Sequence, residues 1–456
     1  METIQSAIAE LRTKIARLDT TVTDLCTRLS AEESQEQQQE QEQEPPKNAI
    51  SLFSGAGGDT LGMERAGYKV VAFNEFKDAA IKTHKAVFPH SVMLVDPATN
   101  KTDIKKVPNS VFEAYKGQVS LLFAGFPCQG FSHAGKKKTD DKRNELVFEF
   151  ARAAKLAEPK WIIGENVKGL LARKGKDPTQ AADAPLRPVI DIIRDLLERT
   201  GYKITYKVID VTEVGVPQHR KRLIIVGHRG TVYPHMPWED LSSASTPPQT
   251  SIRSFLEPHL KDAMEIPALY RPAEQSAHYW IPTTETAATG TPHPNLALLV
   301  SGTRNPSSKE KKENPSIAKK IVEKDGLISF GVRKGGYHGM VVNPDNACNT
   351  IISTYNLCPR LFVGLHNDNA GKYWIRCMTP KELGQIQGFP ADYAWQGTEK
   401  ERIIQIGNAV PPPLGERIVR SLERVVFKSV PQINERVSGE GEADEAGEAG
   451  EADEGT

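Results

Sequence analysis

The chain has 456 residues with 58 basic and 58 acidic side chains, so its formal net charge is zero. It has no apolar run long enough to cross a membrane and no signal-peptide pattern at the N-terminus, which argues against a membrane or secreted protein. The five cysteines form no CxxC pair and no cluster with histidine at zinc spacing. We therefore expect an intracellular protein with neither a disulfide framework nor a metal site.

The zero net charge hides an uneven distribution. Residues 31–46 carry six acids and no base, and residues 437–456 carry eight acids and no base. The intervening residues 47–436 hold 54 basic against 40 acidic side chains. Such an excess is common on solvated surfaces, but it also suits a polyanionic partner such as nucleic acid.

Apolar residues at the N-terminus recur at alternating spacings of four and three, which is the heptad seam of a coiled coil. They are Ile4, Ile8, Leu11, Ile15, Leu18, Val22, Leu25 and Leu29. The pattern predicts a coiled-coil helix over 1–32 that could pair two copies of the chain through residues 4–29; an amphipathic helix folded onto the chain's own core is the alternative. Residues 33–47 are an acidic, glutamine-rich linker, and the acidic tail 431–456 is expected to be disordered.

Between these ends, residues 48–230 alternate apolar runs with helical patterns. Strands are expected at 49–53, 69–73, 91–95, 119–126, 161–165, 203–211 and 222–227, and helices at 60–67, 78–88, 144–157 and 187–199. Such alternation predicts an α/β fold with a mostly parallel sheet covered on both faces. Ligands of these sheets bind at the carboxyl ends of the strands.

The regular pattern is lost over 231–372, where Pro, Ser, Thr and charged residues increase. We interpret this region as a smaller inserted domain. The pattern returns over 373–430, with a helical segment around 414–428, and we assign this part to the first domain.

Cys128 lies in FAGFPCQGFS, at the end of a predicted strand. A lone cysteine is more often a small buried hydrophobe than a nucleophile. Glu165 in IIGENV and the group Gln218, Arg220 and Arg222 in VPQHRKRLIIVG also lie at the edges of apolar runs. A thiol, a carboxyl and two guanidinium groups at strand ends predict an enzyme that acts through a covalent intermediate. Because Arg220 and Arg222 alternate, they would face the same side of a strand.

The turn SGAGG (54–58) stands between a strand and a helix, where backbone can approach a cofactor closely. Glu75 follows the second strand, at the position where an acid takes ribose hydroxyls. Phe76 beside it could stack on an adenine or fill the core.

Six blocks of this sequence resemble, in order, those of the DNA (cytosine-5) methyltransferases, which use S-adenosylmethionine. The blocks are SLFSGAGGDTLG, FAGFPCQGFS, GENV, VPQHRKRLIIVG, LGQIQGFP and QIGNAVPPPLG. The resemblance covers about 49–230 and 376–425. It implies a Rossmann-like methyltransferase fold with an inserted target-recognition domain, S-adenosylmethionine as cofactor and double-stranded DNA as substrate.

The resemblance also implies roles for individual residues. Cys128 would attack C6 of a cytosine flipped out of the duplex, Glu165 would pair with the ring nitrogen and the exocyclic amine, Arg222 would hold the base carbonyl, and Arg220 would support the catalytic loop. The cofactor pocket would be lined by Phe53, Ser54, Gly55, Gly57, Gly58, Glu75, Phe76, Asp103, Ile104, Pro127, Leu146, Asn408 and Val410. Candidates for contact with DNA are Gln129, Ser132 and Thr350, although Thr350 could equally be an ordinary strand threonine.

The chain departs from the family at two places. Ser51 stands where the family usually has Asp, which would weaken the support of the glycine turn, and Lys77 and Asp78 look exchanged. We expect activity to survive both.

Two alternatives stay open. One is tRNA methylation, carried out by a family branch with a Pro-Pro-Cys loop and a Cys-Phe-Thr element; this chain has Phe126-Pro127-Cys128 and no such element. The other is a non-catalytic DNA-binding or scaffold protein, against which the presence of Cys128, Glu165 and Arg222 argues.

Overall fold

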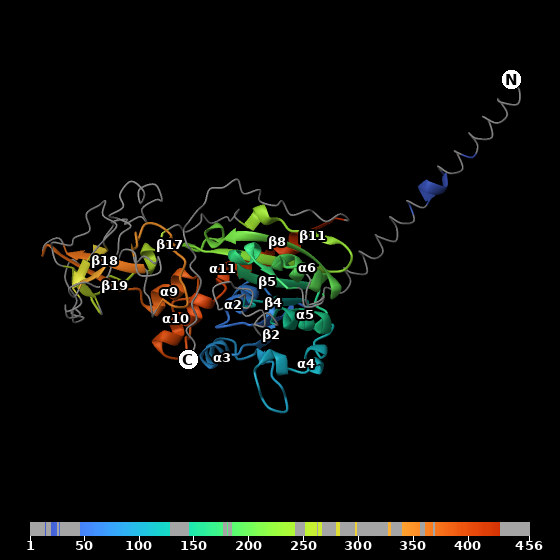
Figure 1. Ribbon diagram of the computed structural model, residues 1–456, viewed down its shortest axis with the longest axis horizontal. Helices are drawn as coiled ribbons and strands as arrows, with labels where there is room; N and C mark the ends of the chain where they lie inside the picture. Colours follow the sequence, from blue (N-terminus) through green and yellow to red (C-terminus); the bar gives the residue numbers. More distant parts are fainter. Residues whose placement is uncertain are drawn as a thin grey trace, which may run out of the picture. The chain divides into compact units, whose positions relative to one another are not determined.

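A computed structural model of the chain is shown in Figure 1. It describes residues 14, 20–24, 27, 46–127, 146–176, 180, 185–241, 251–261, 263–266, 280–282, 297–298, 327–329, 340–355, 361–367 and 370–428. The predicted site residues Cys128, Gln129 and Ser132 lie outside the described residues, as do the acidic tail and nearly all of the linker 33–47. The chain divides into two units, Met1–Pro46 and Lys47–Thr456.

In the first unit the described residues 14, 20–24 and 27 are helical and exposed. Of the predicted heptad seam only Val22 is described, and its side chain is 56% exposed. The helix agrees with the sequence pattern in these few residues, while the coiled coil and the pairing of two copies stay predictions.

The second unit is built on a seven-stranded sheet in the order β3-β2-β1-β4-β5-β10-β8. The strands are β1 (Asn48–Leu52), β2 (Lys69–Asn74), β3 (Val92–Met93), β4 (Leu121–Ala124), β5 (Trp161–Val167), β8 (Tyr202–Asp210) and β10 (Lys221–Arg229). All neighbours are parallel except β10, which is antiparallel to both β5 and β8. The predicted, mostly parallel α/β sheet is confirmed.

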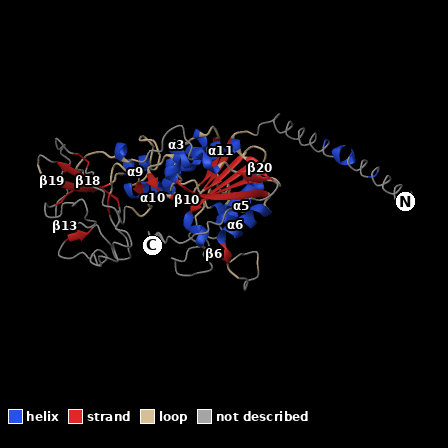
Figure 2. Ribbon diagram, turned by 90° about the horizontal axis from the view of Figure 1, so that it is seen from above, coloured by secondary structure: helices blue, strands red, loops and turns tan. Residues whose placement is uncertain are grey.

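Helices cover both faces of this sheet, and they explain why the central strands β4 and β5 are mostly apolar and buried. The helices of the unit are α2 (Gly58–Arg65), α3 (Asp78–Val87), α4 (Asn109–Glu113), α5 (Leu146–Ala157), α6 (Val189–Arg199), α9 (Pro380–Ile386), α10 (Glu399–Asn408) and α11 (Pro412–Ser421). Leu122 and Ile162 pack in one core with α4, α5 and α6, whereas their neighbours Phe123 and Ile163 pack in another with α2 and α11. Figure 2 shows α11 on one side of the strands and α5 and α6 on the other. Each fully buried side chain of this size contributes roughly 1.5–3 kcal/mol.

The orientation of the strands determines which residues meet. The carboxyl ends of β1, β2, β4 and β5 lie along one edge because these strands are parallel. Since β10 runs the other way, its first residues lie at the same edge, and Arg222 pairs across the sheet with Val167 at the end of β5. The glycine turn, Glu75, Glu165 and Arg222 are therefore gathered at one edge.

A second sheet is formed by β12 (Met264–Ile266), β19 (Lys372–Cys377), β18 (Leu361–Asn367) and β14 (Ala297–Leu298), with β16 (Met340–Val341) paired to β18. Because β18 and β19 form one antiparallel pair, this sheet continues to Cys377. The predicted boundary between residues 372 and 373 thus falls at the start of β19, and the assignment of 231–372 to a separate recognition domain stays a prediction.

The smaller elements complete the described part. They are the strands β6 (Lys174–Gly175), β7 (Arg187–Pro188), β9 (Gln218–His219), β11 (Tyr233–His235), β13 (Trp280–Pro282), β15 (Leu327–Ser329), β17 (Cys348–Asn349) and β20 (Val426–Lys428), and the 3-10 helices η1 (Ile104–Lys106), η4 (Lys168–Ala172), η5 (Val211–Val214), η6 (Trp238–Leu241), η7 (Arg253–Phe255) and η9 (Leu422–Arg424). The helix expected around 414–428 is wrong at its end: α11 stops at Ser421, and β20 pairs with β11. Residues 426–428 take part in an antiparallel pair that sequence periodicity does not reveal.

Candidate active site

The glycine turn follows β1 and leads into α2. Its backbone has positive φ at Phe53 (55°), Gly55 (54°) and Gly57 (88°). A Cβ on Gly57 would lie 2.5 Å from Phe88 Cε2, and one on Gly58 would lie 2.1 Å from the Val410 carbonyl oxygen. Glycine is required at both positions because the turn packs tightly against α3 and against the segment after α10.

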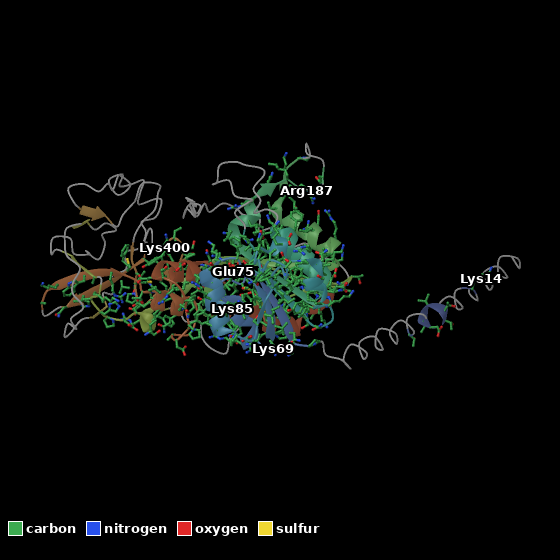
Figure 3. All side chains as sticks on the ribbon, turned by 90° about the horizontal axis from the view of Figure 1, so that it is seen from below. Lys14, Lys69, Glu75, Lys85, Arg187 and Lys400 are labelled. Carbon is green, nitrogen blue, oxygen red and sulfur yellow. The ribbon has the colours of Figure 1, made fainter. Side chains whose placement is uncertain are left out.

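Glu75 and Phe76 form the second part of this edge. The Gly55 amide donates to Glu75 Oε2, and the amides of Phe76 and Lys77 donate to Oε1, each at 2.8 Å. The carboxylate is thereby fixed against the glycine turn (Glu75 is labelled in Figure 3). Phe76 is 70% exposed, so its ring does not fill the core.

Two residues that sequence reasoning missed hold the next loop, which carries the predicted Asp103 and Ile104. Asn74, at the end of β2, donates to the carbonyls of Leu94 (2.9 Å) and Thr102 (3.0 Å). Arg152 of α5 donates to the carbonyls of Ile104 (2.9 Å) and Val107 (3.1 Å).

These contacts place the start of η1 against α5, whose first residue is the predicted Leu146. Asp103 accepts from the amide of Lys105 and so caps η1. The loop that carries Asp103 and Ile104 and the start of α5 therefore lie together beside the carboxyl ends of the strands.

Glu165 and Arg222 form an ion pair, with Arg222 Nε 2.9 Å from Glu165 Oε1 and the side chains only 8% and 12% exposed for Arg222 and Glu165. A Cβ built on Gly125 would lie 3.7 Å from Val410 Cγ2, 3.8 Å from the Phe53 carbonyl and 4.0 Å from Glu165 Oε2. The cofactor residues and the catalytic carboxyl named from sequence therefore surround one glycine at the end of β4.

The segment that leads to Cys128 is anchored up to its last described residue, Pro127. Asn166 is buried and donates through Nδ2 to the Phe126 carbonyl at 2.9 Å. The Phe126 ring stacks on Phe150 of α5 with centroids 5.9 Å apart. Asn166 was missed as a functional residue, although it lies in the GENV block beside Glu165.

Arg220 has a different role from Arg222. It lies between β9 and β10, is 2% exposed, and donates to the carbonyls of Ile351 (2.9 Å), Gly407 (2.9 Å) and Ala409 (3.2 Å). The expectation that the two arginines face the same side of a strand stays a prediction, because Arg220 precedes β10, which begins at Lys221.

Gln218 and Gln387 extend these contacts, and we call Gln218, Arg220 and Gln387 the buried polar network. Gln218 Nε2 donates to Gln387 Oε1, and Gln218 Oε1 accepts from the Ile351 amide at 2.9 Å. Gln387 donates to the carbonyls of Ile406 (3.2 Å) and Ala409 (3.1 Å). The network joins the start of β10 to the backbone that leads to Asn408 and Val410.

The remaining predicted residues differ in exposure. Thr350 is partly buried, and its hydroxyl donates to the His219 carbonyl at 2.6 Å. This is the bond expected of a structural threonine; contact of Thr350 with DNA stays a prediction. Asn408 is exposed at the end of α10, whereas Val410 is buried.

This arrangement fits a charged nucleoside. The fixed Glu75 carboxylate could accept two ribose hydroxyls, the exposed Phe76 ring could stack on a base, and a Cβ on Gly55 would have nothing within 4 Å, so the turn is open there. Asp103 and Leu146 would close the other side.

Comparisons with known proteins identify the family of the chain. The sequence profile of the C-5 cytosine-specific DNA methylases matches residues 47–424. The chain belongs to this family. It is 32% identical over 389 residues to the type II methyltransferase M.PspPI of Psychrobacter sp., which covers 83% of the chain and 79% of that protein. It is 31% identical over 382 residues to M.Eco47II of Escherichia coli, covering 82% and 79%.

Solved structures show the same fold. The chain resembles the S. pombe Dnmt2 methyltransferase with a TM-score of 0.52 at 16% identity, covering 83% of this chain and 98% of that one. It resembles the Entamoeba histolytica methyltransferase EhMeth with a TM-score of 0.50 at 15% identity, covering 84% and 99%.

The chain is thus an enzyme of the DNA (cytosine-5) methyltransferase class, with S-adenosylmethionine as its cofactor. In the part of the chain that the structure describes, no helix is long and apolar enough to span a membrane. No group of three or more histidine, cysteine or acidic residues with metal-binding geometry occurs among those same residues.

Proposed function

We propose that the enzyme methylates C5 of a cytosine flipped out of double-stranded DNA, through a covalent bond between Cys128 and ring carbon C6. The observation that carries the proposal is the Glu165–Arg222 pair, nearly buried at the edge where the anchored Phe126-Pro127 segment leads into Cys128. This edge would supply a carboxyl to activate the ring and a guanidinium to hold its carbonyl, and Pro127 at the same edge directly precedes Cys128 in the sequence.

In this mechanism Cys128 Sγ forms a bond to C6 while the ring nitrogen takes up a proton delivered through Glu165. Glu165 also accepts a hydrogen bond from the exocyclic amine. Arg222 uses Nε for Glu165 and Nη1 for the Lys221 carbonyl. Within the described residues its Nη2 is then available to donate to the base carbonyl. Attack at C6 makes C5 nucleophilic. After the methyl group has been transferred to C5, the ring-nitrogen proton returns through Glu165 and the C5 proton passes to water. This elimination expels the thiolate and restores the aromatic ring.

S-adenosylmethionine, when bound, supplies the methyl group. The residues that would hold it are those that line the edge: Glu75 for the ribose and Phe76 for the adenine. The others are Phe53, Ser54, Gly55, Gly57, Gly58, Asp103, Ile104, Pro127, Leu146, Asn408 and Val410. The fixed carboxylate of Glu75 and the exposed ring of Phe76 support this assignment.

The DNA side of the proposal rests on chemistry and sequence. A base inside a duplex cannot reach a thiol, so the cytosine must leave the helix. We place Gln129 and Ser132 at the DNA backbone, Thr350 among the recognition contacts, and target recognition within 231–372. Arg220 supports the catalytic loop through the buried polar network. A DNA substrate also places the enzyme inside the cell with the DNA.

One assay tests the reaction: methyl transfer from labelled cofactor to duplex DNA and to tRNA, for wild type and Cys128→Ser. We expect labelling of DNA that the variant loses. Cys377→Ser, which changes an exposed cysteine in β19, is the matched control and should stay active. Labelling of tRNA alone, or full activity of Cys128→Ser, would refute the proposal.

A second experiment tests the covalent bond. Duplex DNA with 5-fluorocytosine at the target should form an adduct stable to denaturing electrophoresis, because fluorine at C5 blocks the elimination. The target itself would be identified by bisulfite sequencing of DNA from an expressing host. An enzyme that methylates DNA without a trapped adduct would speak against the thiolate mechanism while leaving the activity in place.

Pairing of two copies through residues 4–29 is a separate proposal, supported only by the heptad pattern. Light scattering of the full-length protein and of a variant lacking 1–32 should give a dimer and a monomer respectively. A monomeric full-length protein would rule it out.

A further inference from the structure

Ser51 and Asp59 join the two ends of the glycine turn. Ser51 is in β1 before the turn, and Asp59 is in the first turn of α2 directly after it. The Ser51 hydroxyl donates to Asp59 Oδ2 at 2.5 Å, and the two residues are 0% and 2% exposed. The pair is therefore a buried clasp across the segment that would hold the cofactor.

Ionisation of the buried Asp59 carboxyl is energetically unfavourable. Burial raises its pKa to about 7, the Ser51 hydroxyl and the backbone amides of Thr60 and Asp59 lower it, and the charge of Glu165 raises it further. None of these main influences is a basic side chain. An asparagine would accept the same hydrogen bond without the cost of a buried charge. A cationic ligand near the turn would offset that cost.

The groups that face this carboxyl come from several elements. Glu165 of β5 acts on it through charge. Tyr393, which follows α9, donates its hydroxyl to the carbonyl of Ala56 in the turn at 2.5 Å. Burial raises the pKa of Tyr393, and the charge of Asp59 adds to this shift. From α11 the facing residue is Gly415, which has no side chain.

We propose that Asp59 is a positioning residue that braces the glycine turn from α2, with Ser51 as its hydrogen-bond partner, and that its negative charge favours the cationic cofactor. The inference deepens the proposed function, because it rests on the glycine turn as the cofactor site. Under this proposal Ser51 supports the turn through its bond to Asp59, instead of weakening it.

The test compares the binding of two ligands that differ by one charge. S-adenosylmethionine carries a sulfonium cation, whereas S-adenosylhomocysteine has a neutral thioether. Calorimetry on Asp59→Asn should show affinity for S-adenosylmethionine lowered roughly tenfold and affinity for S-adenosylhomocysteine lowered less than about threefold, since only the cation loses a charge interaction. A merely structural clasp would weaken both ligands equally, which would overturn the inference.

Rescue by exchange is the second arm. The double variant Ser51→Asp with Asp59→Ser keeps the clasp and moves the carboxyl to β1. It should restore affinity for S-adenosylmethionine to within about threefold of wild type, whereas Asp59→Ser alone should not. Failure of the exchange in a folded protein would contradict the proposed role of the carboxyl in this pair.

The pH dependence of binding provides a third readout. Between pH 6 and 8 the wild-type affinity for S-adenosylmethionine should rise relative to that of Asp59→Asn, because Asp59 ionises in about this range. Asp78→Asn, at the exposed first-turn acid of α3, is the matched control and should change neither ligand. If wild type binds neither ligand, the proposed function itself fails; if it binds both and Asp59→Asn behaves as wild type, only this inference fails.

Discussion

The side-chain hydrogen bonds of Ser51 and Glu75 at the glycine turn join residues that are close in the sequence, whereas the buried polar network beside the Glu165–Arg222 pair joins distant segments. Ser51 and Asp59 are 8 residues apart, and Gly55 and Glu75 are 20 apart. In the buried polar network, the separations are 169 residues for Gln218–Gln387 and 187 for Arg220–Gly407.

This difference predicts different effects for substitutions in the glycine turn and in the buried polar network. The turn lies in one β-α-β unit, so a change there should act mainly on cofactor binding. The network forms only when long stretches of chain have closed, and the entropy of that closure is recovered only in the complete fold. A change in the network should therefore act on the stability of the whole second unit.

The largest effect is expected for Arg220→Ala. The variant removes a hydrogen-bond donor from the buried carbonyls of Ile351 and Gly407, at about 1–3 kcal/mol for each. The Ala409 carbonyl keeps its bond from Gln387. Urea unfolding should show a loss of several kcal/mol together with a loss of activity. Arg222→Ala is the contrasting variant: it should abolish methyl transfer with a smaller loss of stability. If Arg220→Ala were as stable as wild type, the buried polar network would not contribute to the stability of the second unit as proposed.

The next effect concerns residues around the glycine turn, and it is a change in how the stability of the protein depends on pH. Burial raises the pKa of Asp59 from 3.8 to about 7, and burial lowers the pKa of His84 from 6.5 to about 3. The contribution of Asp59 is present below pH 4 and is lost as the pH rises to about 7. The contribution of His84 is present above pH 6.5 and is lost as the pH falls to about 3.

Between pH 4 and 6.5 the two slopes oppose each other, at about 1.4 kcal/mol per pH unit each. Asp59→Asn should therefore lose stability on acidification, and His84→Gln should lose stability on alkalinisation. Chemical unfolding at pH 4.5, 5.5 and 6.5 measures both slopes. Parallel pH profiles for the two variants would contradict the opposite signs.

A smaller effect is expected for Asn166→Ala, which tests the link between Glu165 and the segment before Cys128. Removing its bond to the buried Phe126 carbonyl should cost about 1–2 kcal/mol of stability. Methyl transfer should fall more than this loss explains, because the segment before the thiol is released. Asn166→Asp keeps an acceptor for the Val167 amide but loses the donor, and it should resemble Asn166→Ala. A kcat equal to that of wild type would show that the anchor has no catalytic role.

The smallest change in stability is expected for Phe76→Ala, because the ring is 70% exposed. Unfolding should be unchanged within about 0.5 kcal/mol. The KM for the cofactor should rise about three- to tenfold if the ring stacks on adenine. Phe76→Tyr should retain binding, and a KM unchanged in Phe76→Ala would exclude Phe76 from the cofactor site.

Much of the parallel sheet and of the glycine turn could be predicted from the sequence. The alternation of strands and helices predicted the parallel sheet, and the order of strand and glycine turn placed Gly55 and Glu75 at one edge. These inferences succeed because hydrogen bonding and burial act over a few residues and leave a periodic pattern. The Ser51–Asp59 pair was missed, although both residues lie within one block. An acidic residue in the first turn of a helix is common on protein surfaces, so the sequence does not indicate that Asp59 is buried.

The sequence alone determined the α/β class, the family blocks and the residue types at the site. Only the tertiary structure decided that Arg222 meets Glu165 while Arg220 turns to the backbone of Ile351 and Gly407. That choice depends on β10 running antiparallel and starting at Lys221, a property of how strands assemble. Contacts between residues separated by well over a hundred positions follow from the packing of the whole unit. They leave no periodic pattern in the local sequence from which they could be predicted.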